Sequence, residues 1–347
     1  MWVFSKKQDL LFLLLPVWTC WLIAFLLPDG VRGMEIPLWV WVVFVLGVDV
    51  GHVWGSIFRT YLDKEEFALH RKAFIYIPMV SFLAVFLIVL ISVSLFWTVL
   101  AYLAVFHFIK QQYGFMQIYK AKNQDFEPRL IRDDWLIYIA MIYPLVFWHF
   151  NTDRNFVWFV MGDFLQVEGF DTQFFNQIGN FAYLILLLGW LVQETIFHKF
   201  VLSKVLWVLT TAGNWFLGIV FFNSDLVFTI TNVVAHGIPY LALVIIYQQR
   251  KYLYKNLTLK STYPIIVITV ILLLAYWEEW FWDLFVYREH TSIFPLKLYK
   301  WVNPTQIVQA AMIALLSVPQ ITHYCIDGFI WRSNSQNPYI KKVLLAD

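Results

Sequence analysis

Four of the eight histidines lie inside long apolar stretches, where an imidazole side chain has no water to bind. They are His52, His107, His236 and His323. Neutral imidazole is the commonest protein ligand for metal ions, and it suits iron, copper and zinc. Because an ionisable group inside a membrane span is costly, such a group points to a function. We interpret the four histidines as candidate ligands of one metal ion.

Each of these histidines has polar neighbours at helical spacing. Asp49 precedes His52 by three residues, and Asp327 follows His323 by four. Residues three or four apart share one face of a helix. A metal-bound histidine usually donates its other ring N–H to a carboxylate or a carbonyl group. The two aspartates are therefore predicted partners of the ligands, although a carboxylate is also able to bind the metal directly.

The other two spans carry an amide and a phenol in equivalent positions. Gln111 follows His107 by four residues, and Tyr240 follows His236 by four. A single histidine inside a membrane often serves only as a hydrogen-bonding group between helices. Four of them, each with a polar neighbour, favour a functional site instead. The predicted catalytic residues are Asp49, Asp327, Tyr240 and Gln111.

The composition requires that membrane helices position these residues. Of the 347 residues 61% are hydrophobic and only 14% are charged, whereas soluble domains have about 45–50% and about 25%. This excludes soluble enzymes, disordered proteins and secreted disulfide scaffolds. The net charge of +2 gives no indication of a nucleic-acid partner. Cys20 and Cys325 both lie in apolar stretches, so we expect neither a disulfide framework nor a cysteine-based metal cluster.

The apolar stretches predict an all-α polytopic bundle that forms a single domain over residues 1–347. Because the fifth stretch is short, we expect eight to ten spans. Residues 151–177 are predicted to form a loop outside the cytoplasm, with an interfacial or re-entrant segment at 156–167. The ten stretches are 10–27, 38–62, 75–94, 96–119, 134–150, 178–197, 203–222, 226–247, 263–283 and 305–328.

Lysine and arginine concentrate in alternate loops and at both ends of the chain. Because cytoplasmic loops of membrane proteins are enriched in these residues, both termini are predicted to be cytoplasmic. We expect a multi-pass protein of the cytoplasmic membrane of a bacterium. All four histidine-bearing spans then run from the outside to the inside. A rise of about 1.5 Å per residue places all four histidines between the midplane and the cytoplasmic boundary, so they are able to share one site.

The other four histidines are expected to lie outside this site. His70 and His198 have basic neighbours at the cytoplasmic interface, which is typical of solvated side chains. Folding back of His70 as an additional ligand is the alternative. His149 and His290 are predicted at the outer side, too far from the other four.

Further polar and small residues have simpler interpretations. Arg59 is predicted to pair with Asp63 or to hold a carboxylate or phosphate headgroup. Gly114 and Gly237 are predicted to allow close approach between helices. The acidic residues at the outer end of the ninth stretch are interpreted as interfacial; they are Glu278, Glu279 and Asp283.

Single histidines distributed over several transmembrane helices resemble the arrangement in the bacterial integral-membrane beta-carotene-cleaving dioxygenases, whose iron is held by four histidines. The resemblance implies that His52, His107, His236 and His323 are iron ligands. It covers only these four short segments. The clustered HxxxH and HxxHH boxes of membrane desaturases and hydroxylases do not occur in the sequence, which argues against a di-iron centre of that type.

The leading hypothesis is an integral-membrane metalloenzyme, an oxidoreductase with non-haem iron that acts as a dioxygenase on a lipid or isoprenoid substrate from the bilayer. An electron donor is an expected partner, and zinc is an alternative metal. A second hypothesis is a haem-binding electron-transfer protein with histidine pairs as axial ligands. A third is a metal-free lipid transferase in which one histidine acts as general base beside an aspartate. A transporter with a proton relay is disfavoured because we find no inverted repeat.

Overall fold

The computed structural model describes residues 1–167, 169, 172–290, 292–294 and 305–345. Every regular element among these residues is helical. Nine helical segments within this part of the chain are long and apolar enough to cross a membrane. The predicted all-α class and the range of eight to ten spans are therefore confirmed.

The nine segments match nine of the ten predicted stretches. The remaining predicted stretch, the fifth, corresponds to α8 (Asp133–Phe150), which is as short as expected. Short helices α3 (Asp29–Arg32) and α14 (Pro338–Ile340) lie outside the spans, and π-helical turns (η) interrupt several of the longer segments. The nine are Lys6–Leu26 (α1, η1, α2), Leu38–Arg59 (α4, η2, α5), Lys64–Ile91 (α6), Val93–Asn123 (α7), Thr172–Ile196 (α9), Leu202–Phe221 (α10, η3), Asp225–Tyr254 (α11), Tyr263–Tyr287 (α12, η4) and Gln306–Ile330 (α13).

Three of the four histidine-bearing helices begin at a hydroxyl residue that caps them. The side chains of Ser92, Ser224 and Thr305 accept a hydrogen bond from a backbone N–H in the first turn of α7, α11 and α13, respectively. Such a cap satisfies one of the N–H groups that a helix start leaves unpaired, and it is worth about 1 kcal/mol. The cap therefore fixes the residue at which each helix enters the apolar region.

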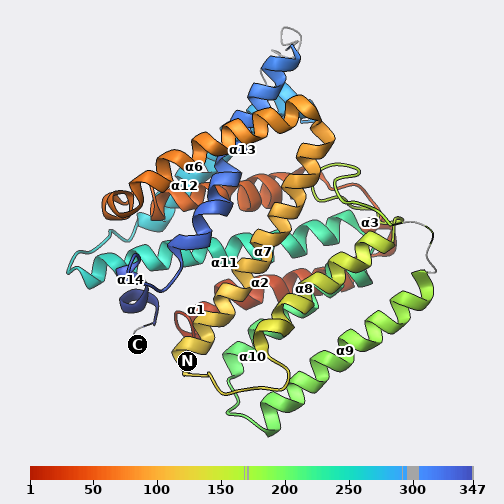
Figure 1. Cartoon of the computed structure of the whole chain (residues 1–347), viewed down its shortest axis with the longest axis vertical. Coiled ribbons are helices and arrows are strands. Elements are labelled where there is room, and N and C mark those ends of the chain that lie inside the picture. Colours follow the sequence, from red (N-terminus) through yellow and green to blue (C-terminus); the bar gives the residue numbers. More distant parts are fainter. Residues whose placement is uncertain (168, 170–171, 291, 295–304, 346–347) are drawn as a thin grey trace.

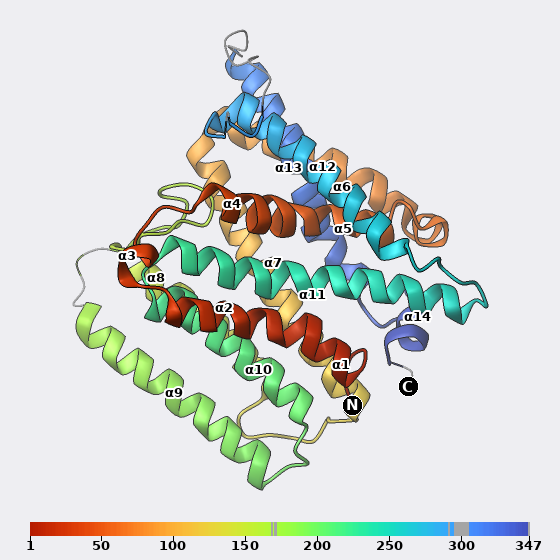
Figure 2. The same ribbon diagram turned by 180° about the vertical axis from the view of Figure 1, so that it is seen from behind.

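Helix α11 lies at the centre of the bundle. In its most apolar stretch 78% of the residues are buried, compared with 11% in α9 at the edge. Helices α6, α12 and α13 lie on one side of α11, whereas α2, α8 and α10 lie on the other, and α7 crosses between the two groups (Figures 1 and 2). The central helix is thus in a position to present side chains to both groups.

The histidine-bearing helices end at the same end of the bundle. Arg59 at the end of α5 donates to the backbone oxygen of Ile330 at the end of α13, at 3.2 Å. Near the end of α11, Arg250 donates to the backbone oxygen of Phe4 at 2.7 Å. Asn123, which ends α7, donates to the backbone oxygen of the first residue at 2.9 Å. The parallel direction predicted for these four helices is therefore confirmed.

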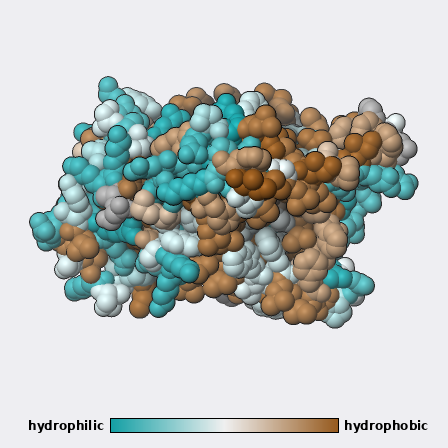
Figure 3. Space-filling model, turned by 90° about the horizontal axis from the view of Figure 1, so that it is seen from below, coloured by the Kyte–Doolittle hydropathy of each residue, from teal (hydrophilic) through white to brown (hydrophobic). Residues whose placement is uncertain are grey.

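Both chain termini also lie at that end (Figure 1). Hydrophilic side chains gather toward this side of the molecule when it is seen from below, and hydrophobic ones cover most of the opposite side (Figure 3). A large exposed apolar surface beside a polar end is typical of a protein that contacts a membrane.

The loop before α9 contains no helix among its described residues 151–167 and 169. Two of its phenylalanines are nevertheless buried. Phe156 stacks on Phe228 of α11 with ring centroids 4.6 Å apart, and Phe164 packs edge-on against Trp148 of α8. The loop is thereby fixed onto the outer ends of these two helices.

A buried ionic network joins α8, α9 and α10 at the end of the bundle that carries the termini. Lys204 lies 2.7 Å from Asp125, 3.2 Å from Asp133 and 2.5 Å from Glu194, and Arg129 contacts the same carboxylates. Burial alone would raise the pKa of Asp125 in the preceding loop, but the hydrogen bonds and charges of Lys204 and Arg129 outweigh it and lower that pKa. Lys120 adds a third cation, 3.0 Å from Asp133, so the three carboxylates are neutralised by three neighbouring cations.

Gly237 allows α11 to approach η2 closely. A Cβ atom at this position would lie 2.9 Å from the backbone oxygen of Val48 and 2.6 Å from its Cγ1 atom. A backbone oxygen within a helix has little freedom to move away. The role predicted for Gly237 is confirmed, whereas that for Gly114 is wrong, because a Cβ atom there would meet nothing within 4 Å.

We expect Gly237→Ala to destabilise the protein by about 1–3 kcal/mol, because the added methyl group forces the two helices apart. The melting temperature in detergent should fall. Gly114→Ala is the matched control and should melt at or slightly above the wild-type temperature, since alanine favours helix where there is room. Equal melting of both variants would contradict the close approach.

Lys204→Met is expected to cost about 3–5 kcal/mol, because it leaves three buried carboxylates with too little positive charge. The melting temperature in detergent should fall clearly, whereas Lys199→Met, at an exposed lysine of the same connection, should leave it unchanged. An unaffected Lys204→Met protein would mean that the network contributes no stability.

Candidate metal centre

The four histidines predicted to be ligands meet in the interior of the bundle. His52 of α5, His107 of α7, His236 of α11 and His323 of α13 each offer a ring nitrogen, and these nitrogens all lie within 4.8 Å of one another. None of the four side chains is more than 5% exposed. They come from positions up to 271 residues apart, so only the packing of the four helices brings them together.

The four imidazole rings form a closed cycle. Centroids of neighbouring rings are 4.5 Å apart for His52 and His236, and 4.9 Å for His236 and His107. The cycle continues at 4.6 Å from His107 to His323 and returns to His52 at 5.1 Å. All four contacts are edge-to-face, so in each contact the edge of one imidazole is directed toward the face of its neighbour.

Several of the ring nitrogens have no hydrogen-bond partner. These are Nδ1 of His52, Nε2 of His107, Nδ1 of His236 and both ring nitrogens of His323. The Nε2 atoms of His52 and His236 are 3.0 Å apart. A buried polar atom without a partner costs about 1–3 kcal/mol, and such atoms are rare in proteins. A metal ion would satisfy these lone pairs together, so the donor set fits a cation that prefers nitrogen ligands.

The two predicted aspartates lie beside two of the histidines. The distance between Asp49 Oδ1 and His52 Nδ1 is 3.7 Å, and that between Asp327 Oδ1 and His323 Nδ1 is 3.8 Å. Both are too long for a hydrogen bond, although they are short enough for charge interaction. Tyr240 donates its hydroxyl to Asp327 Oδ1 at 2.9 Å, which fixes that carboxylate.

Gln111 lies close to the cluster, but its amide group is used in helix packing. Its Nε2 atom donates to the backbone oxygen of His236 at 2.8 Å. The adjacent Gln112 donates to the backbone oxygen of Ala235 at 3.1 Å. The two amides fasten α7 to α11 at the level of the histidines, so Gln111 acts first as a positioning residue.

Two aromatic rings that the sequence interpretation missed support the cluster. Phe108 stacks on His236 at 3.7 Å between centroids and 11° between planes. Tyr324 stacks on His107 at 4.5 Å and 24°. Each of these aromatic residues directly follows a histidine of its own helix and stacks on a histidine of another. The dipeptides His-Phe and His-Tyr in the sequence were the available signal.

Ion pairs close the cluster toward the end that carries the termini. Arg59 pairs with Glu66 at 2.6 Å rather than with Asp63, which corrects the sequence prediction. Asp63 instead lies 2.6 Å from Lys251. Burial would raise the pKa of Asp63, but the hydrogen bond and charge of Lys251 lower it below its usual value. Arg59 also lies over the Tyr247 ring at 4.4 Å.

The remaining four histidines are engaged elsewhere, as expected, and His70 does not fold back into the cluster. Three of them hydrogen-bond to other side chains and the fourth stacks on an indole. The pairs are His70 with Asn337 at 3.1 Å, His149 with Tyr102 at 2.6 Å, His198 with Glu127 at 3.1 Å and His290 with Trp41 at 3.9 Å between ring centroids.

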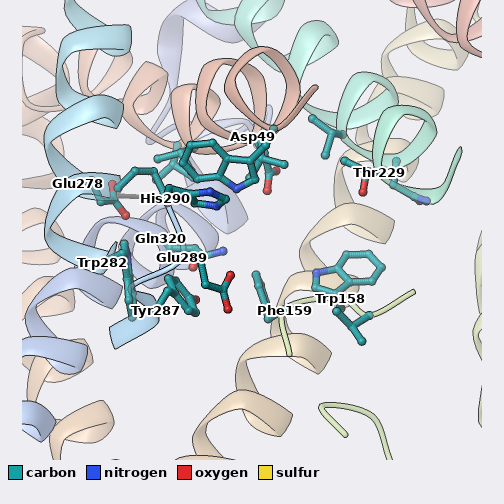
Figure 4. A pocket seen from close by; sticks show the side chains of 18 of the residues that line it. Asp49, Trp158, Phe159, Thr229, Glu278, Trp282, Tyr287, Glu289, His290 and Gln320 are labelled. Atoms are coloured by element: carbon teal, nitrogen blue, oxygen red, sulfur yellow. The ribbon is translucent and has the colours of Figure 1, made fainter. Parts of the chain in front are cut away.

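A cavity of about 240 Å³ lies on the opposite side of the cluster. Its lining includes Asp49, Asn232 and Gln320, which are three or four residues before His52, His236 and His323, respectively. Phe108, next to His107, lines it as well. Side chains of η2, α12 and α13 and of the loop at Trp158 surround this space (Figure 4). The cavity therefore reaches the layer of residues one helical turn from the histidines.

The acidic residues at the end of α12 line this cavity, which revises their interpretation as interfacial groups. Glu278 accepts a hydrogen bond from Trp54 Nε1 at 2.6 Å. Asp283 caps the following turn by accepting from the backbone N–H groups of Glu289 and His290. Burial lowers the pKa of His290, against the opposing effect of Asp283 and Glu289. Two adjacent glutamates inside an apolar helix were the signal for this site.

No protein family, curated protein or solved structure matches this chain. The arrangement of the site alone therefore carries the functional argument: a buried four-histidine group that could hold a metal ion within a polytopic helical membrane protein.

Proposed function

We propose that the protein is an integral-membrane metalloenzyme in which His52, His107, His236 and His323 hold one metal ion, a single non-haem iron rather than a haem. The observation that carries the proposal is the convergence of four buried imidazoles, which offer ring nitrogens within 4.8 Å of one another and leave five ring nitrogens without a hydrogen-bond partner. Simple helix packing would pair these atoms with donors or acceptors on neighbouring helices.

The geometry favours a single ion over a haem. A haem requires two histidines on opposite faces of a wide planar ring. Here the four imidazoles form one cycle with centroid distances of 4.5–5.1 Å, which leaves no room for such a ring between them. Iron, zinc and copper all accept imidazole nitrogen, and oxidative chemistry favours iron among them. A bound iron with open positions would supply oxygen activation; the protein would supply its ligands and their dry surroundings.

We further propose that the substrate is a lipid or isoprenoid that enters from the bilayer. The cluster lies among apolar helices whose outer surfaces carry large exposed hydrophobic side chains, such as Ile91, Leu83 and Val80 of α6. These surfaces favour contact with lipid chains. Tyr240 and Asp327 would orient His323 and hold a proton at the Tyr240 hydroxyl. Asp49 would orient His52. An electron donor remains an expected partner.

Purified protein should contain about one metal ion per chain, and a visible spectrum should show no Soret band. Single replacement of any of the four histidines by alanine should lower metal content strongly, because each removes one ligand. Elemental analysis after size-exclusion chromatography measures this.

His149→Ala is the matched control, because this partly buried histidine lies in the same bundle but binds Tyr102 instead. It should retain the full metal content. A metal-free wild-type protein that is folded, with all four histidines intact, would overturn the proposal and favour the metal-free transferase. A Soret band would favour haem.

Asp327→Asn is expected to weaken metal affinity by about ten- to a hundredfold, as is usual for the carboxylate partner of a ligating histidine. Tyr240→Phe should have a smaller effect in the same direction, since it removes only the hydroxyl that fixes the carboxylate. Competition with a chelator measures both affinities. If neither variant changes the affinity while His323→Ala abolishes binding, Asp327 does not act through His323.

A further inference from the structure

The cavity beside the histidine cluster is lined by several carboxylates. Glu289 belongs to the loop after η4, Glu279 to α12, and Asp49 lies one helical turn from His52. Figure 4 shows the side chains of Glu289 and Asp49 on facing sides of the same space. Asp49 is also the residue whose Oδ1 atom is 3.7 Å from His52. One of the lining carboxylates, that of Asp49, therefore lies beside the candidate metal ligand His52.

Among the described residues, no lysine or arginine pairs with Glu279 or Glu289 of this set. Within the described part of the chain no hydrogen bond or ion pair engages the side chain of Glu279 or Glu289. On the other side of the cluster, by contrast, Glu66 and Asp63 are paired with Arg59 and Lys251. Unpaired negative charge in a space with apolar walls attracts cations strongly.

A second polar group points to a ligand in the same space. Asn232, on α11 one turn before His236, is only 4% exposed, and its Oδ1 atom has no hydrogen-bond partner. The side chain lines the cavity. A carbonyl oxygen of this kind is a suitable ligand for a hard divalent cation or its water. Asn232 and Asp49 thus place two oxygen donors at the inner end of the cavity.

The size of the cavity suits an ion rather than a lipid. A water molecule occupies about 30 Å³ in the liquid, so 240 Å³ holds about eight of them. Pockets for drug-sized ligands are typically about 300–1,000 Å³, and a long lipid or isoprenoid would need more. A hydrated divalent cation fits, with the carboxylates replacing its water.

We propose that this cavity is a cation-binding vestibule, in which Glu289, Glu279, Asp49 and Asn232 receive a divalent metal ion and pass it to the four histidines. This inference rests on the proposed four-histidine metal site and adds how a fully buried site is loaded. The transfer exchanges oxygen ligands for imidazole nitrogens and involves no change in oxidation state.

The test is the rate at which metal-free protein takes up Co²⁺, whose visible absorption changes when nitrogen ligands replace water. Stopped-flow mixing compares the wild type with Glu279→Gln and with the Glu279→Gln, Glu289→Gln double variant. Asp153→Asn is the matched control, because Asp153 is exposed in an outer loop and does not line the cavity.

We expect uptake to slow by about tenfold in the double variant, since lining charge raises the entry rate of ions into clefts by about this factor or more. The final amount of bound Co²⁺ should equal that of the wild type, which shows that the variants are folded and the histidine site intact. Wild-type uptake should slow with added salt, and less so in the double variant.

Three outcomes would overturn the proposal, and they are distinguishable. If the wild type binds Co²⁺ and the double variant binds it at the same rate and salt dependence, the vestibule is overturned and the metal site stands. If the wild type binds no Co²⁺ at all, both the metal site and the vestibule are overturned. A slowed rate in Asp153→Asn as well would assign the effect to overall surface charge and would likewise overturn the vestibule.

Discussion

The arrangement of the bundle depends on the burial of four imidazoles in an apolar interior. Polar atoms without partners oppose folding there, by about 1–3 kcal/mol each, and His107, His236 and His323 together bury four such nitrogens. Close helix packing is what keeps them at one point: Gly237 lets η2 approach α11, and Gln111 fastens α7 to the backbone of His236. A metal ion that binds these nitrogens removes the free-energy cost of leaving them unpaired, and this favours its binding.

The sequence allowed the metal-site candidates to be predicted because two regular properties define their position. Loop charge sets the direction of every span, and helical rise sets the depth of every residue, so parallel spans with histidines at similar depth must bring them to one level. Contacts between helices are not given by either rule. The spacing of Arg59 and Asp63 suggested an ion pair, but in the folded protein Arg59 pairs with Glu66. The same limit explains why the hydrogen bond from Gln111 to the backbone of His236 and the stacking of Phe108 on His236 were not predicted.

The two sides of the histidine cluster differ in whether their carboxylates are paired with cations. Toward the termini, Arg59 and Lys251 pair with Glu66 and Asp63, which makes that side electrically balanced and closed. Toward the cavity, carboxylates face open space next to aromatic walls. A balanced side holds the helices together, because removal of one partner would leave a buried charge. Carboxylates without a paired cation are costly in apolar surroundings unless a ligand neutralises them. We therefore interpret the side that faces the cavity as the side from which a cation binds.

Charge also explains why two aspartates accompany four neutral ligands. A divalent ion bound only by neutral imidazoles would bring two positive charges into a medium of low dielectric constant, which is strongly unfavourable. Asp49 and Asp327 lie 3.7 and 3.8 Å from the Nδ1 atoms of His52 and His323 and would supply two negative charges. Ion, ligands and aspartates then form a neutral group. Because the aspartates approach from two different helices, the balance is reached only when α5 and α13 are both in place, so charge neutrality and the fold of the site require each other.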